Sequence, residues 1–257
     1  MAPRGNNHCR DLSRITGRVI CSKYPTPSTI SWPCLSLHSS LPSDDWPYLY
    51  LKGRNIPTPY IKAIGILLSI AFVLIAVFLR KRKDILSLSS LNFFVLGSAF
   101  LLLETKSITS LSLLFGSTWS VNAFVFASIL TMLYLANLMV TKKEIKNISM
   151  VYGLLGLSLI LNFFLPADYF LGTNYWLRAL LSTTVATLPI FFSAIIFSHT
   201  FKLVSKENIG SMYGINLAGA VFGGFLEYSS MIFGLKYMYV IAGILYTVSF
   251  MINYYRK

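Results

Sequence analysis

The sequence predicts an all-α bundle of about seven transmembrane helices, preceded by a mostly disordered N-terminal tail. Hydrophobic residues make up 55% of the chain and charged residues only 12%, whereas a soluble domain carries about 25% charge. The mean hydropathy is +0.64, which also excludes disorder for the chain as a whole, because disorder needs low hydrophobicity. Long apolar runs fill residues 60–257, while residues 1–59 are rich in Ser, Pro, Arg and Cys. An integral membrane protein is the class that remains.

The predicted tail covers residues 1–40 and shows no helical or strand periodicity. It contains the three cysteines of the chain, Cys9, Cys21 and Cys34. No CxxC pair lies at zinc-site spacing and an odd number of cysteines gives no complete disulfide set, so we predict no metal site. Basic residues are present without a following apolar core, so we also predict no signal peptide.

Residues 41–59 form a juxtamembrane segment of acidic, aromatic and proline residues, with Asp44, Asp45, Trp46 and Pro47 at its centre. Two adjacent carboxylates have two interpretations, as a pair for acid–base chemistry or as solvated or capping groups in a turn. The aromatic side chains suit the interface between membrane and water. Prolines close to residue 60 predict a rigid start for the first helix.

A helix needs about 20 predominantly apolar residues to cross a bilayer. Because lipid offers the backbone no hydrogen-bond partner, each run of that length should be helical. The apolar runs of the chain are residues 60–79, 89–115, 118–140, 148–166, 177–200, 209–233 and 236–254.

Basic residues alternate between the loops and thereby predict the topology. They follow the first, third, fifth and last runs: Arg80, Lys81, Arg82, Lys83, Lys142, Lys143, Lys146, Lys202, Lys206, Arg256 and Lys257. The opposite short loops hold Arg178 and Lys236. Basic loops mark the cytoplasmic side, so we expect a protein of the inner (plasma) membrane with a cytoplasmic C-terminus. Lys52, Arg54 and Lys62 precede the first helix and oppose an outer position for its start.

This arrangement also explains the net charge of +13 without nucleic acid. Half of the 22 basic residues are topology signals, and those of the tail are scattered without interleaved aromatic residues. A nucleic-acid-binding surface would gather them on one face. We therefore predict the lipid bilayer as a partner and no nucleic acid.

Ionisable side chains at membrane depth are rare and are candidates for function. The apolar runs contain Glu104, Lys106 and Glu227. Glu104 and Lys106 are two residues apart, about 200° around a helix, and cannot pair with each other. Each therefore needs a partner on another helix or a hydrated cavity. Both a structural ion pair and a path for an ion or substrate fit this pattern. Asn122 is a candidate for an interhelical hydrogen bond.

The run 209–233 has the most regular pattern of small residues. Small-xxx-small spacing lets two helix backbones approach closely, and the glycines with this spacing are Gly210, Gly214, Gly219, Gly223 and Gly224. Asn216 and Glu227 fall on the same stripe as Gly223. A Glu227–Lys106 ion pair is then the simplest way to satisfy both charges. This hypothesis predicts that swapping the two charges partly rescues the single substitutions.

No catalytic constellation is found in the chain. There is no GxGxxG, P-loop, HExxH or GxSxG motif, and the glycines lie inside an apolar helix instead of following a strand. We therefore predict no catalytic residues and no cofactor for this chain.

Three stretches resemble the membrane-embedded C-terminal region of bacterial spermidine-synthase-like (aminopropyltransferase or methyltransferase-like) membrane proteins. They are residues 44–51 (DDWPYLYL), residues 102–137 with the segments LLETKS and LLFGSTWSVN, and residues 216–228 (NLAGAVFGGFLEY). The resemblance covers about residues 41–257. In that family a nucleotide-binding-type domain precedes the Asp-Trp-Pro segment. Residues 1–40 do not resemble the end of such a domain, and the glycine-rich cofactor loop has no counterpart.

The resemblance implies a membrane half that is made alone and has no enzymatic activity of its own. We expect it to act as an anchor or membrane partner for a catalytic domain on another chain, or to form a homo-oligomer. One alternative is a carrier or channel for a small cation or polyamine, and another is a purely structural assembly subunit. A transporter should show two similar halves with broken helices, and the glycines concentrate in one helix only.

Overall fold

The computed structural model describes residues 45–48, 51, 53–81, 87–116, 118–165 and 175–255, with positions 72, 74–81, 175 and 176 described by their backbone alone. The chain divides into residues 1–38 and residues 39–257, and every described residue belongs to the second unit. The predicted tail 1–40, with its three cysteines, and Asp44 lie outside the described residues.

Every regular element in the described part of the chain is a helix, and each predicted apolar run contains at least one. In chain order the elements are α2 (Thr58–Lys81), α3 (Leu88–Phe115), α4 (Trp119–Lys142), α5 (Ile148–Phe164), α6 (Tyr175–Lys202), the 3₁₀ turn η3 (Lys206–Asn208), α7 (Ile209–Glu227), α8 (Ser230–Phe233) and α9 (Tyr237–Tyr255). The all-α class is therefore confirmed for these residues.

By length and composition, five helical segments are able to cross a membrane. They are Leu88–Phe115, Trp119–Lys142, Leu177–Lys202, Lys206–Phe233 and Tyr237–Tyr255. Two apolar helical segments in the described residues are shorter, Thr58–Ala71 at the start of α2 and Ile148–Phe164, which is α5. These segments suggest a membrane protein with five candidate spans, and the sixth and seventh spans stay a prediction.

The run 209–233, predicted as one helix, is interrupted. α7 ends at Glu227, a turn follows at Tyr228 and Ser229, and the single-turn helix α8 ends at Phe233, with Gly234 directly after it. Gly234 has a φ of 100°, a conformation open mainly to glycine. This residue redirects the chain into α9. Glu227 therefore lies at a helix end and not within a continuous helix.

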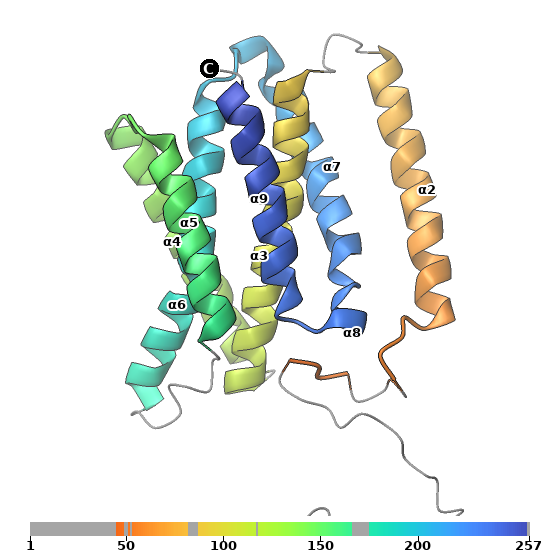
Figure 1. Ribbon diagram of the computed structural model, residues 1–257, viewed down its shortest axis with the longest axis vertical. Coiled ribbons are helices and arrows are strands. Elements are labelled where there is room, and N and C mark those ends of the chain that lie inside the picture. Colours follow the sequence, from red (N-terminus) through yellow and green to blue (C-terminus); the bar gives the residue numbers. More distant parts are fainter. Residues whose placement is uncertain are drawn as a thin grey trace, which may run out of the picture. The chain divides into compact units, whose positions relative to one another are not determined.

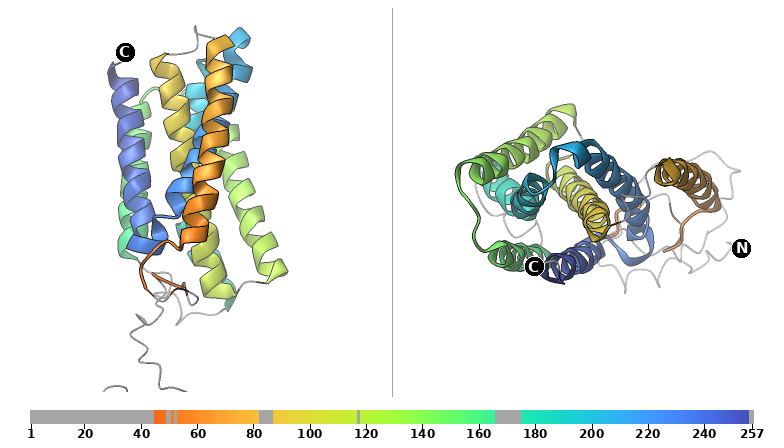
Figure 2. Two further views of the ribbon diagram at one scale, coloured as in Figure 1. Left: turned by 90° about the vertical axis from the view of Figure 1, so that its right-hand side faces the viewer. Right: turned by 90° about the horizontal axis from the view of Figure 1, so that it is seen from above.

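The helix α3 is central to the bundle (Figures 1 and 2). It packs against α7, α9 and α6, while α4 and α5 pack against α6, and α5 also contacts α9. The main apolar core lies around α3 and contains Leu96, Leu102 and Leu103, each 2% exposed or less. The helix α2 contacts α7. Helical connections alternate between the two ends of the bundle, and the C-terminus shares one end with the α4–α5 and α6–α7 connections (Figure 1).

The contact between α3 and α7 depends on backbone proximity. A Cβ atom added at Gly219 would overlap the backbone of Phe94, and one added at Gly223 would lie 2.5 Å from the carbonyl oxygen of Ser98. Ser98 Oγ also donates a hydrogen bond of 2.7 Å to the Gly219 carbonyl. Close helix packing of this kind is what small-xxx-small spacing favours.

The other glycines of this helix behave differently. A Cβ atom at Gly224 would lie 3.3 Å from the Leu101 side chain, whereas Gly210 and Gly214 have nothing within 4 Å and are exposed. The predicted packing role of Gly210 and Gly214 is therefore corrected. Both lie in the first turns of α7, outside the stretch around Gly219 and Gly223 that meets the backbone of α3.

Candidate functional site

The juxtamembrane segment docks onto the connection between α7 and α9. The backbone carbonyl of Asp45 accepts a hydrogen bond of 2.7 Å from the Leu235 amide. The Oδ1 atom of Asp45 accepts another, also 2.7 Å long, from the Lys236 amide, directly before α9. A Cβ atom at Gly234 would lie 2.6 Å from Asp45 Oδ2, so glycine is needed there for this approach as well as for the turn. Of the two interpretations of this acidic pair, the structure gives Asp45 a capping role.

Trp46 is the buried centre of this junction. Its side chain is 1% exposed and clusters with Leu51 and Met231. Its indole Nε1 donates a hydrogen bond of 2.7 Å to the Met231 carbonyl. The Trp46 ring, which the sequence placed at the membrane interface, is therefore buried inside the protein. We call residues 45–48 together with residues 230–236 the junction.

Tyr48 adds a second side-chain contact to the junction. Pro47, between Trp46 and Tyr48, is partly exposed. The Tyr48 hydroxyl shares a hydrogen bond with Ser230 Oγ. Burial raises the pKa of the Tyr48 phenol above its usual value, the hydrogen bond with Ser230 opposes this rise, and the negative charge of Glu227 adds to it. Tyr48 therefore stays protonated throughout the physiological range.

Lys106 lies in α3 and is only 7% exposed. Its Nζ donates a hydrogen bond of 2.6 Å to Ser110 Oγ and lies 5.4 Å from the centre of the Tyr239 ring, a cation–π contact. The charges that act on it are Asp45, which attracts it, and Lys236, which repels it. The buried lysine thus has its acidic neighbour in the junction.

The hypothesis of a Glu227–Lys106 ion pair is wrong for the described residues. Among them no ion pair joins these two side chains, and Lys106 contacts α9 and its own helix instead. The physical reason is angular. Gly97 lies on the face of α3 that meets α7, because a Cβ atom there would overlap the Asn216 backbone, and Lys106 lies nine residues later, about 180° around the helix. Glu227 is partly buried at the last position of α7.

The other predicted polar residues are separated from the junction or from one another. Asn216 donates a hydrogen bond of 3.0 Å to the Phe93 carbonyl of α3, and Asn122 accepts one of 3.3 Å from Ser112. Glu104 is partly buried on α3, seven residues and so about 20° around the helix from Gly97, whose added Cβ atom would overlap the Asn216 backbone of α7. The structure therefore brings Lys106 into contact with Ser110 and Tyr239, and Asp45 acts on it through its charge without a direct ion pair between the two described side chains.

Comparison of the chain with protein-family models, with curated proteins and with solved structures gave no match.

A polar network at the other end of the bundle was not predicted as a unit. Asn92 Oδ1 accepts from Ser249 Oγ at 2.6 Å, Ser249 bonds the Tyr152 hydroxyl at 2.7 Å, and Asn253 Nδ2 donates to the same hydroxyl at 2.8 Å. Asn92 Nδ2 closes the ring by donating to Asn253 Oδ1 at 3.2 Å. Ser249 and Asn253 are four residues apart on α9, a spacing that would have indicated a shared polar face.

Replacing Tyr152 by Phe should destabilise the bundle by about 1 kcal/mol, because interhelical hydrogen bonds in membranes contribute about 0.6 kcal/mol each on average and two are lost. The free energy of unfolding in mixed micelles measures this effect. Tyr254→Phe is the matched control, since Tyr254 is 66% exposed. Equal stability of the two variants would contradict the network.

The charge swap Lys106→Glu with Glu227→Lys should be at least as unstable as Lys106→Glu alone, because the two residues do not pair and Asp45 then faces a second carboxylate. By contrast, Lys106→Gln and Asp45→Asn should show a coupling energy of about 0.5 kcal/mol or more in a double-mutant cycle. Unfolding free energies of the single and double variants give both results. A swap that restores stability would reinstate the Glu227 pair.

Proposed function

We propose that this chain is a multi-pass membrane domain that anchors, or serves as the membrane partner of, a separate catalytic domain of spermidine-synthase-like type, without a cofactor of its own. The observation that carries the proposal is the junction. Asp45 and Trp46 fix the segment before α2 onto the α7–α9 connection through three hydrogen bonds and a buried indole. A protein or domain held at this segment would therefore have a defined position relative to the bundle.

Charge supports an orientation for this anchor. Lys142, Lys143, Lys146, Lys202 and Lys206 belong to the connections at the end that also holds the C-terminus (Figure 1). Because basic loops face the cytoplasm, we propose an inner-membrane protein with this end inside. The junction is then at the outer end, as is the start of α2. α2 has 24 residues and is about 36 Å long, enough for a full span.

Labelling single cysteines tests this orientation. Gly53→Cys reports the junction end and Lys146→Cys the basic end, each in a background with Cys9, Cys21 and Cys34 replaced by serine. A membrane-impermeant maleimide added to intact cells should label residue 53 at once and residue 146 only after permeabilisation. The reverse pattern would place the junction in the cytoplasm, on the side where an S-adenosyl-type cofactor is made.

Anchoring itself is tested with a soluble reporter domain fused directly before Asp45. In nanodiscs the polarised emission of the reporter should show restricted rotation, and Trp46→Ala should restore the freedom of a flexibly linked reporter. If the two proteins rotate equally, the junction holds nothing in place and the proposal fails.

The carrier alternative needs its own measurement. Lys106 is a buried cation, and a cation path is more naturally lined by acidic groups. We expect proteoliposomes with the purified chain to take up spermidine, Na⁺ or K⁺ no faster than protein-free vesicles. Uptake above that level, lowered by Glu104→Gln or Glu227→Gln, would replace the anchor by a carrier.

A further inference from the structure

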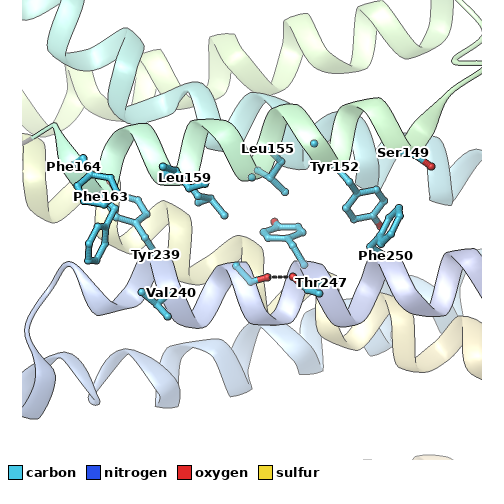
Figure 3. A pocket seen from close by; sticks show the side chains of 15 residues that line it. Ser149, Tyr152, Leu155, Leu159, Phe163, Phe164, Tyr239, Val240, Thr247 and Phe250 are labelled. Atoms are coloured by element: carbon cyan, nitrogen blue, oxygen red, sulfur yellow. Dashed lines mark hydrogen bonds between the residues drawn. The ribbon is translucent and has the colours of Figure 1, made fainter.

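A long apolar groove lies between α5 and α9, and Tyr239, the cation–π partner of Lys106, is among the residues that line it (Figure 3). Its volume is about 600 Å³, and it extends from Ser149 to Phe164 along α5. Figure 3 shows Leu155 and Leu159 between the two helices, with Phe163 and Phe164 towards one end and Tyr152 and Phe250 towards the other. The groove therefore follows the helix axes.

Glycines keep the groove open. A Cβ atom at Gly153 or Gly156 of α5 would meet nothing within 4 Å, and one at Gly243 of α9 would make only an ordinary contact of 3.7 Å with Leu159. This is the reverse of Gly219 and Gly223, where a Cβ atom would overlap α3. The glycines of the groove therefore face open space that a bound molecule could occupy, whereas Gly219 and Gly223 face the backbone of another helix.

The dimensions favour a hydrocarbon chain. Phe164 lies 15 positions after Ser149 on α5, which corresponds to a helix length of about 22 Å. Spread over this length, the groove volume of about 600 Å³ gives a mean cross-section of about 27 Å² and a mean width of about 6 Å. A linear acyl chain lies in the same direction as the helix axes within a hydrocarbon core about 30 Å thick.

The surroundings of the groove are those of a lipid-facing surface. Ile160, which lines the groove, is 57% exposed, and Leu157 and Ile244, which directly follow the lining residues Gly156 and Gly243, are 61% and 60% exposed. Exposed apolar patches of this kind mark membrane contacts. An occupant can therefore enter sideways from the bilayer.

Charge distinguishes the two ends of the groove. Lys143 and Lys146 are exposed in the connection directly before α5, with Glu144 between them, and Ser149 lines that end of the groove. The far end on α5 is formed by Phe163 and Phe164. A molecule with an apolar tail and an anionic head is complementary to this arrangement.

We propose that the α5–α9 groove binds one acyl chain of an anionic phospholipid, whose phosphate lies against Lys143 and Lys146. This inference is independent of the anchor proposal and requires only that the bundle lies in a bilayer.

The test is retention of lipid after purification from nanodiscs that contain equal amounts of phosphatidylglycerol and phosphatidylcholine. Native mass spectrometry should find one phosphatidylglycerol on the wild type and a loss of at least about fivefold in the Gly156→Leu/Gly243→Leu variant, whose leucines fill the groove. Gly214→Leu is the matched control, because Gly214 also has nothing within 4 Å but lies on α7. Helical circular dichroism and monodispersity check the fold of each variant, and Gly156→Ala gives a smaller perturbation of the same site.

A second arm tests the charged end. Lys143→Gln with Lys146→Gln should reduce the preference for phosphatidylglycerol over phosphatidylcholine roughly tenfold while some lipid is still retained. Equal lipid retention by the wild type and the Gly156→Leu/Gly243→Leu variant would overturn the proposal. Disulfide-linked dimers through Gly156→Cys, in the background without Cys9, Cys21 and Cys34, would also overturn it and assign the groove to a second copy of this chain.

Discussion

Replacing Gly223 by leucine should destabilise the bundle by about 3 kcal/mol or more, the upper part of the range for overpacked sites. The added Cβ would lie 2.5 Å from the Ser98 carbonyl oxygen, and backbone atoms cannot move aside as a flexible side chain can. The helices α3 and α7 must then separate, which also lengthens the hydrogen bond from Ser98 to Gly219. The free energy of unfolding in mixed micelles is the measurement.

Gly214→Leu is the control for this substitution. It adds the same side chain to the same helix at a position with open space, and it should change stability by less than about 0.5 kcal/mol. If the two leucine variants are equally stable, the close contact between α3 and α7 is absent.

Replacing Trp46 by alanine should release the juxtamembrane segment. Removing a large buried aromatic side chain is worth about 3–5 kcal/mol in a core, and the Met231 carbonyl also loses its hydrogen bond. Two hydrogen bonds to Asp45 and one between Tyr48 and Ser230 then remain, without a buried apolar side chain. We therefore expect local undocking while the bundle keeps its helices. A nitroxide attached at Gly53→Cys, where a Cβ atom meets nothing within 4 Å, should become several-fold more mobile in its electron paramagnetic resonance spectrum.

Two variants separate the causes. Trp46→Phe keeps most of the apolar area and removes the hydrogen bond, so it should have a smaller effect, about 1 kcal/mol. Trp119→Ala should leave the label unchanged, because Trp119 is 82% exposed. Unchanged mobility in Trp46→Ala would show that the segment is not docked.

The length of the apolar runs was sufficient to predict the helices. Each of the seven apolar runs contains a helix, and most boundaries agree within a few residues, as the run 89–115 and α3 (Leu88–Phe115) illustrate. The break after Glu227 was missed because Tyr228 and Ser229 are compatible with an apolar helix, and the positive φ of Gly234 is not visible in a run of apolar letters.

The partners of the polar residues were harder to predict because they depend on how the helices are rotated against one another. The stripe of Asn216 and Gly223 correctly faces α3, yet the same reasoning assigned Lys106 to Glu227, although Lys106 faces α9. Trp46 was expected at a membrane interface and is buried against Met231, 185 residues away. A contact of that sequence separation has no local signal.

The α5–α9 groove was also beyond sequence reasoning. Gly153, Gly156 and Gly243 are single glycines in apolar helices, and nothing in the letters distinguishes an open glycine from a packed one such as Gly219. The distinction requires coordinates of both neighbouring helices.

Amide hydrogen exchange of Leu235 and Lys236 tests the junction most directly, because both amides donate to Asp45. In the wild type they should exchange at least about tenfold more slowly than in Trp46→Ala, while amides in the middle of α9 keep their protection in both proteins. Equal exchange of Leu235 and Lys236 in the two proteins would contradict docking of residues 45–48, and with it the anchor.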